Sequence, residues 1–157
     1  MLDVAALVEA AKIMHQTDKR LVTVNGSFDI LHAGHLDQLE EAKAQGDVLV
    51  VGINSDRSIQ AEKGSGRPNI PEQARAALLA ALVCVDYVVI IDAPYSEVQD
   101  ILIDSVKPQV HVNGPQYGPP ETWLEWPAMQ RHGTIGYTVE KRNEISTSAI
   151  VEKIRRG

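Results

Sequence analysis

The amino-acid sequence predicts a Rossmann-like, doubly wound α/β sandwich with a five-stranded, mostly parallel sheet. Short apolar runs alternate with longer segments whose apolar residues recur every three or four positions, which is the pattern of strands followed by helices. One run, 48–53, contains no polar side chain, as expected for a strand that helices cover on both faces. Five strand–helix units of this kind favour a parallel α/β sheet over an antiparallel one.

The first third of the chain is expected to contain two helices and two strands. Asp3 can cap a helix over 3–16, whose apolar residues form one stripe. The apolar run 21–25 is the first strand. A helix over 35–45 then leads to the second strand at 48–53.

Residues 57–70 are expected to form an irregular loop, because they contain Lys63-Gly64-Ser65-Gly66-Arg67-Pro68. Two glycines and two cations suit a mobile loop that closes on a phosphate, and the same composition fits an exposed, solvated loop. Pro71 is well placed to open the next helix, which runs to about residue 82. Arg75 falls off the apolar stripe of that helix, toward one edge.

The second half of the chain repeats the strand–helix pattern. A strand is expected at 85–91, and Ser96 with Gln99 forms a capping box that opens a helix to about Val106. The remaining elements are a strand at 110–113, a helix around Trp123 and Trp126 that Pro127 interrupts or restarts, a strand at 135–140, and a final helix opened by 146–148.

Length and composition describe an ordinary globular protein. The 157 residues suffice for one domain, 1–157, with an N-terminal helix in 1–19 and a core in 20–157. A net charge of −6 disfavours a nucleic-acid partner, which needs a basic surface. The single cysteine, Cys84, permits no intrachain disulfide and is expected to pack in the core. Neither a signal-peptide pattern nor a membrane-spanning apolar run occurs, so we expect a cytoplasmic protein without a membrane partner.

The strongest functional signal is the sequence N-G-S-F-D-I-L-H-A-G-H at 25–35, between the first strand and its helix. His32 and His35 lie where that helix would begin, and helix N-termini attract anions. The pair alone could be half a metal site or one core and one exposed histidine, although no cysteine or third histidine completes a zinc site. Gly26 and Ser27 allow a phosphate to approach the backbone, and Gly34 leaves room between the imidazoles.

This frame is the H-x-G-H motif, and with it the chain resembles the cytidylyltransferase-like nucleotidyltransferase superfamily. From about Arg20 to Arg155 it is most similar to the bacterial adenylyltransferase of ADP-heptose synthesis, which acts on D-glycero-β-D-manno-heptose 1-phosphate. The similar segments are 63–68, Arg75, 78–82, 85–89 and 146–155. Glycerol-3-phosphate and ethanolamine-phosphate cytidylyltransferases share the motif and an I-S-T-[TS] segment, but their middle sections are less similar.

The resemblance implies transfer of a nucleotide from ATP or CTP to a phosphorylated small acceptor such as a sugar 1-phosphate, with Mg²⁺ bridging the nucleotide phosphates, in a homodimer. It assigns catalytic roles to His32, His35 and Lys63, and no protein ligand to the metal. The implied nucleotide-binding residues are Gly26, Ser27, Phe28, Gly34, Arg75, Asn113, Gly114, Arg142, Ser146, Thr147 and Ser148. Acceptor binding would fall to Lys63, Arg67, Gln116 and Tyr117.

One departure from the heptose enzymes bears on the substrate. Those enzymes typically carry V-K-G-G-D-Y after the fourth strand, where this chain has Asn113 in place of the lysine and Gln116 in place of the acid. The alternatives are therefore a cytidylyltransferase for an alcohol phosphate and a non-catalytic nucleotide-binding paralogue. A dehydrogenase is disfavoured, because no G-x-G-x-x-G follows the first strand. Asp29 is expected to brace the turn, His111 and His132 to be structural or on the surface, and both tryptophans to pack in the core or a lid.

Overall fold

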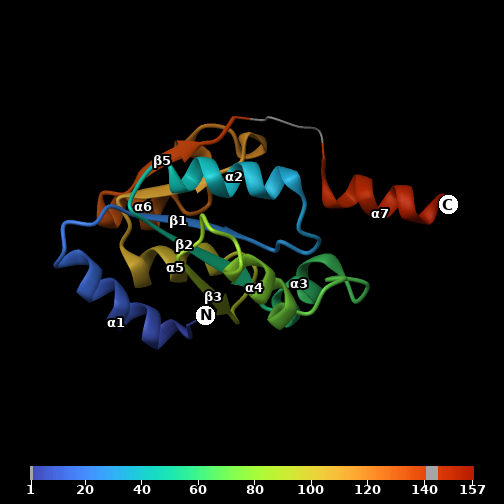
Figure 1. Ribbon diagram of the computed structural model, residues 1–157, viewed down its shortest axis with the longest axis horizontal. Helices are drawn as coiled ribbons and strands as arrows, with labels where there is room; N and C mark the ends of the chain where they lie inside the picture. Colours follow the sequence, from blue (N-terminus) through green and yellow to red (C-terminus); the bar gives the residue numbers. More distant parts are fainter. Residues whose placement is uncertain (1, 141–144) are drawn as a thin grey trace.

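The computed structural model describes residues 2–140 and 145–157 (Figure 1). Its centre is a five-stranded sheet in the order β3-β2-β1-β4-β5, and every neighbouring pair of strands is parallel. The strands are β1 Leu21–Gly26, β2 Val48–Asn54, β3 Tyr87–Ile91, β4 Val110–Asn113 and β5 Ile135–Thr138. The predicted fold class and its five strands are therefore confirmed, with ends that differ by two residues or fewer.

Helices cover both faces of the sheet. The helices are α1 Val4–His15, α2 Ala33–Lys43, α3 Asp56–Lys63, α4 Glu72–Ala80, α5 Val98–Val106, α6 Trp126–His132 and α7 Thr147–Arg155. The short 3₁₀ turns η1 Pro115–Tyr117 and η2 Pro120–Thr122 follow β4. Among the described residues, no helix is long and apolar enough to cross a membrane.

Side chains alternate between the two faces along the strands, and this alternation divides the core in two. Val22 and Val24 of β1 pack with Leu39 of α2 and Leu79 of α4 on one face. Leu21, which is adjacent in sequence, joins the other face, where α1 and α5 supply Leu7, Met14, Val98 and Leu102. A third cluster, built on Trp123 and Met129, extends the core beneath α6.

The expected irregular loop at 57–70 is wrong in its first half, because α3 occupies 56–63. The hydroxyl oxygen of Ser55 accepts a hydrogen bond from the backbone N–H of Ser58, and Asp56 places a negative charge in the first turn. Both features stabilise a helix N-terminus. The glycines that suggested a loop begin only at Gly64, where the helix ends.

The segment around the two tryptophans divides at Trp126. Trp123 precedes the helix and is buried, whereas α6 begins at Trp126 with Pro127 in its first turn. Proline is tolerated there because the first helical N–H groups have no partner within the helix. The predicted helix around both tryptophans is therefore wrong for Trp123 and right for Trp126, and the expected core packing of Trp123 is confirmed.

The predicted final helix is present as α7, with Ser146 as its N-cap. It has no buried residue, and 71% of Ile154 is exposed. Figure 1 shows α7 at the side of the sandwich, away from the helices that cover the sheet. Its N-terminal end nevertheless lines the pocket described below.

Candidate active site

A pocket of about 820 Å³ opens at the carboxyl ends of β1 and β4. This is the edge where ligands bind in open parallel sheets, and the volume suits a small-molecule site. The predicted site residues that line it are Gly26, Ser27, Phe28, His32, Gly34, His35, Lys63, Arg67, Asn113, Gly114, Gln116, Tyr117, Ser146, Thr147 and Ser148. Arg75 does not line it, and Arg142 lies outside the described residues.

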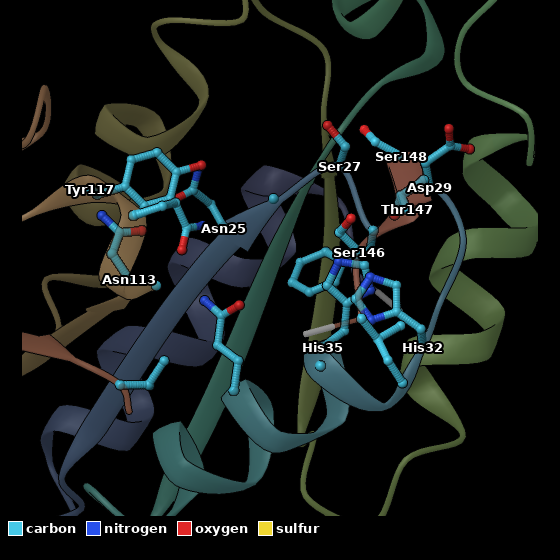
Figure 2. Close-up of a pocket in the computed structure, with 18 of the residues that line it drawn as sticks. Asn25, Ser27, Asp29, His32, His35, Asn113, Tyr117, Ser146, Thr147 and Ser148 are labelled. Atoms are coloured by element: carbon cyan, nitrogen blue, oxygen red, sulfur yellow. The ribbon is translucent and has the colours of Figure 1, made fainter. Parts of the chain in front are cut away.

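His32 and His35 form a stacked pair at the start of α2 (Figure 2). Their ring centroids are 3.8 Å apart, and the rings of Phe28 and His35 form a T-shaped pair with centroids 5.1 Å apart. The Nδ1 atoms of both histidines are buried without a hydrogen-bond partner among the described residues. Two imidazoles thus lie beside the first turn of a helix, each with a ring nitrogen that has no partner among the described residues.

Both imidazoles are held in the neutral state. Burial lowers the pKa of His35 to about 4, and the neighbouring His32 contributes in the same direction. Burial also lowers the pKa of His32. A stacked pair of charged rings would repel, so the free site favours two neutral rings, each with one N–H to donate.

The turn that carries the histidines needs Gly26. Phe28 adopts a left-handed backbone conformation, with φ of 45°. This conformation turns its ring back over Gly26, where an added Cβ would lie 3.0 Å from the ring. A side chain at position 26 would therefore displace the ring that packs against His35.

Asp29 braces the same turn, as the sequence predicted. Its carboxylate accepts hydrogen bonds from the backbone N–H groups of Asn69 at 2.6 Å and Ile70 at 3.0 Å, and from Nε of Arg67 at 2.7 Å. Burial alone would raise the pKa of Asp29, but these hydrogen bonds and the Arg67 charge lower it. The acid ties the loop before α4 to the histidine turn.

Arg75 is the one predicted phosphate contact that the structure contradicts. Its side chain is fully buried, and its guanidinium donates to the carbonyl oxygens of Ser27, Asn54 and Ile70 and to the Asp56 carboxylate. Since all of these bonds lie inside the protein, Arg75 holds three loops together behind the pocket. The sequence placed it at the edge of the helix but could not show which groups it would meet.

Lys63 reaches the pocket from the end of α3. Its Nζ donates to the Ser27 hydroxyl at 3.2 Å and lies 5.2 Å from the ring centroid of Tyr95. Tyr95 also lines the pocket, and the sequence reasoning missed it. The signal was available, because Tyr95 closely follows the third strand and the carboxyl ends of parallel strands share one edge.

The N-terminal end of α7 lines the pocket with Ser146, Thr147 and Ser148. The Ser146 hydroxyl caps the helix by accepting a hydrogen bond from the N–H of Ala149 at 3.2 Å. The first N–H groups of a helix have no partner within the helix, and they attract anions. In Figure 2 these serines and Thr147 lie on the same side of the pocket as His32 and His35.

The other histidines singled out in the sequence are structural, as predicted. His111 is completely buried, and its ring forms a T-shaped pair with Trp123. His132 lies on α6, with its Nε2 2.8 Å from the Asp104 carboxylate. Cys84 is half-buried and packs against the core cluster of α2 and α4. The described residues contain no group of three His, Cys, Asp or Glu side chains that could hold a metal ion.

The chain is thus a parallel α/β protein whose carboxyl edge carries two histidines and a helix start, an arrangement that suits a phosphate-bearing ligand. The Cytidylyltransferase-like family model matches residues 23–153, and the chain belongs to this family.

Two similar curated proteins carry the name Bifunctional protein HldE. One, from Helicobacter pylori, is 42% identical, with 97% of this chain and 35% of that protein covered. Another, from Geotalea uraniireducens, is 44% identical, with 98% of this chain and 30% of that protein covered. The chain therefore spans about a third of the length of these relatives.

Two solved structures share the fold. A lipopolysaccharide core biosynthesis protein from Thermoplasma volcanium superposes with a TM-score of 0.65 at 28% identity, covering 80% of this chain and 99% of that one. Pantoate-beta-alanine ligase from Francisella tularensis superposes with a TM-score of 0.67 at 14% identity, covering 99% and 77%. The second likeness concerns the fold alone.

Proposed function

We propose that this chain transfers a nucleoside monophosphate from a nucleoside triphosphate to a phosphorylated small acceptor. The favoured donor is ATP, and the favoured acceptor class is a sugar 1-phosphate such as heptose 1-phosphate. The observation that carries the proposal is the neutral, stacked pair His32 and His35 at the start of α2, inside a pocket large enough for a nucleotide. Similarity to two HldE proteins supports the acceptor class.

The proposed reaction forms one bond and breaks one bond. A phosphate oxygen of the acceptor attacks the α-phosphorus of the nucleotide, and the bond from that phosphorus to the bridging oxygen of the β-phosphate breaks. Pyrophosphate leaves with the bonding electrons. The acceptor phosphate is already an anion, so the protein needs neither a nucleophile nor a strong base, and rate acceleration comes from positioning and charge stabilisation.

The residues divide this work between the two sides of the triphosphate. His32 and His35 donate hydrogen bonds to phosphate oxygens as negative charge builds on them. Lys63, beside Ser27, neutralises the acceptor phosphate or the α-phosphate. The N–H groups at the start of α7 hold the outer phosphates, and Arg142 is proposed to join them.

Mg²⁺ would enter with the nucleotide. The pocket offers scattered carboxylates, and Asp29 already bonds to Arg67, Asn69 and Ile70. The described residues thus fit an ion held mainly by phosphate oxygens, where it would offset their negative charge.

A screen for pyrophosphate release tests the proposal. ATP and CTP are each paired with heptose 1-phosphate, other sugar 1-phosphates and glycerol 3-phosphate. Release with ATP and a sugar 1-phosphate is the expected result, whereas release only with CTP and glycerol 3-phosphate would establish the alcohol-phosphate alternative. No release with any pair, despite nucleotide binding, would identify a non-catalytic paralogue.

A single variant tests the role of the histidines. His35→Ala should lower kcat/KM at least a hundredfold, because it removes a donor aimed at developing charge. A loss of under about tenfold, which is roughly 1.4 kcal/mol, would contradict the role given to His35.

A further inference from the structure

A buried polar chain lies directly beneath the pocket wall formed by β4. Asn113, at the end of β4, lines the pocket, and its amide nitrogen donates a short hydrogen bond to the Glu125 carboxylate. The same Glu125 oxygen, Oε1, lies 3.2 Å from Nε2 of His111. The other ring nitrogen of His111, Nδ1, is 2.8 Å from the Thr23 hydroxyl. All four residues are at least 94% buried.

Glu125 is an anion in this setting. Burial alone would raise the pKa of its carboxyl group, but the contacts from His111 and Asn113 and the N–H at the helix start lower it. A carboxylate has no hydrogen to donate, so it can only accept. The Asn113 group facing Glu125 must therefore be its NH₂ group, which identifies the two ends of the amide from chemistry.

This arrangement gives the pocket a hydrogen-bond acceptor in a fixed position. With the NH₂ end of Asn113 held by Glu125, its carbonyl oxygen Oδ1 is the end presented to the pocket. In Figure 2 the amide of Asn113 stands opposite His32 and His35, with its oxygen on the side toward Asn25. Rotating the amide would place its oxygen against the Glu125 carboxylate, where two acceptors repel.

Asn113 lies at the end of the pocket away from the phosphate-binding groups. His32, His35 and the start of α7 lie together on one side, while Asn113 and Tyr117 lie on the other (Figure 2). A triphosphate bound at the histidines would extend its nucleoside toward Asn113. A fixed acceptor at that position matches the exocyclic amino group of adenine or cytosine and opposes the keto group of hypoxanthine or uracil.

We infer that Glu125 is a positioning residue that locks the Asn113 amide, and that Asn113 selects nucleotides whose base carries an amino group. This inference rests on the proposed function and adds a base-selecting site to it. It also gives a role to the segment between Trp123 and Trp126, which delivers Glu125 to the underside of β4.

Calorimetric titration with ATP and with ITP in the presence of Mg²⁺ tests the inference. ITP differs from ATP by a keto group in place of the amino group and by a proton on N1. The wild-type protein should bind ATP at least tenfold more tightly than ITP. Asn113→Ala should bring the two dissociation constants within about threefold, since the acceptor is gone.

The Glu125 variants separate positioning from folding. Glu125→Leu frees the Asn113 amide to rotate. The dissociation constants of this variant for ATP and ITP should therefore differ by less than about threefold, mainly because ITP binds more tightly. Glu125→Gln retains an oxygen that can accept from Asn113, so it should keep the wild-type ratio. Glu121→Leu, an exposed site on the preceding turn, is the matched control and should change nothing.

Each outcome bears on one claim. If Asn113→Ala keeps the wild-type ratio, the inference fails while the proposed function stands. The inference would also fail if Asn113→Ala weakened binding of the sugar phosphate and left the ATP-to-ITP ratio unchanged, because Asn113 would then contact the sugar phosphate. If Glu125→Leu fails to fold, Asn113→Ala still decides the question. If the wild-type protein binds no triphosphate, the proposed function itself fails.

Discussion

At the scale of single residues, the site depends on keeping two imidazoles uncharged. His32 and His35 stack at 3.8 Å, a separation that disfavours charging both rings. Neutral rings also leave the free pocket ready to accept a triphosphate, whose negative charge would then favour protonation. The charge state of each imidazole therefore depends on the charge state of the other.

The charge state of His35 should appear in the stability of the ligand-free protein. The pKa of His35 is about 4 in the folded state, against about 6.5 in an unfolded chain. The unfolded chain binds more protons between these values, so stability should fall as the pH is lowered across that window. Between pH 7 and pH 5 the loss from His35 should be about 2 kcal/mol.

Urea unfolding at pH 7 and pH 5 measures this loss. The His35→Gln variant should lack it, so the difference in unfolding free energy between the two pH values should be smaller by about 2 kcal/mol in the variant. Equal pH dependence in both proteins would show that His35 titrates normally in the folded state.

Asp29 should matter for stability more than its position in the turn suggests. Its two oxygens accept from Asn69, Ile70 and Arg67, whereas an amide side chain at this position would offer one oxygen and turn an NH₂ group toward these donors. We expect Asp29→Asn to cost about 2–4 kcal/mol, because buried donors lose their partner. Asp92→Asn, which weakens an exposed pair with Arg57 and leaves an oxygen for the Ser55 hydroxyl, should cost much less. Thermal unfolding of both variants gives the comparison, and equal effects would contradict the bracing role.

At the scale of elements, the strands followed from the sequence while α3 did not. A short apolar run between turn residues, such as 48–53, favours a buried strand of about the same length, so its bounds were predictable. The helix α3 contains only two buried residues, Ser58 and Ile59, and therefore shows almost no apolar stripe. Its local signal is the cap at Ser55, which the glycines after Lys63 outweighed in the sequence reasoning.

The candidate site likewise contains features that the sequence predicts and contacts that it does not. Asn113 ends a predicted strand and His35 closely follows another, and both line the pocket because strand ends share an edge of the sheet. Contacts between side chains from distant segments were not predictable. Arg75 bonds to three carbonyl groups that the sequence separates from it by up to 48 positions, and Glu125 reaches β4 only through the packing of Trp123.

The helix α3 matters because it sets the position of Lys63. We expect Lys63→Ala to lower kcat about a hundredfold with KM changed less than about threefold, since the ammonium stabilises charge that develops during the reaction. Arg57→Ala is the matched control on the same helix, because Arg57 pairs with Asp92 on the surface and does not line the pocket. Steady-state kinetics of both variants decide the matter. An effect of Lys63→Ala confined to KM would make Lys63 a binding residue only.

At the scale of the whole molecule, the parallel sheet brings distant segments to one pocket. Segments near residues 27, 63, 95, 113 and 146 all line it, because every strand runs in the same direction and ends at the same edge. We propose that 1–157 forms one nucleotidyltransferase unit, equivalent to about a third of its longer relatives. The homodimer stays a prediction, which sedimentation equilibrium can test.

The helix α7 combines a role in the pocket with weak attachment to the rest of the protein. Since none of its residues is buried, removing 146–157 should change the free energy of unfolding by less than about 1 kcal/mol. The same truncation removes the helix start that would hold the outer phosphates, so affinity for ATP should fall at least tenfold. Urea unfolding and calorimetric titration of the truncated protein measure the two effects, with Ser146→Ala as a milder variant that loses only the cap at Ala149.

A large loss of stability would mean that α7 packs against the sandwich in solution. Unchanged ATP affinity would exclude the start of α7 from the nucleotide site and leave His32, His35 and Lys63 as the groups that bind the phosphates.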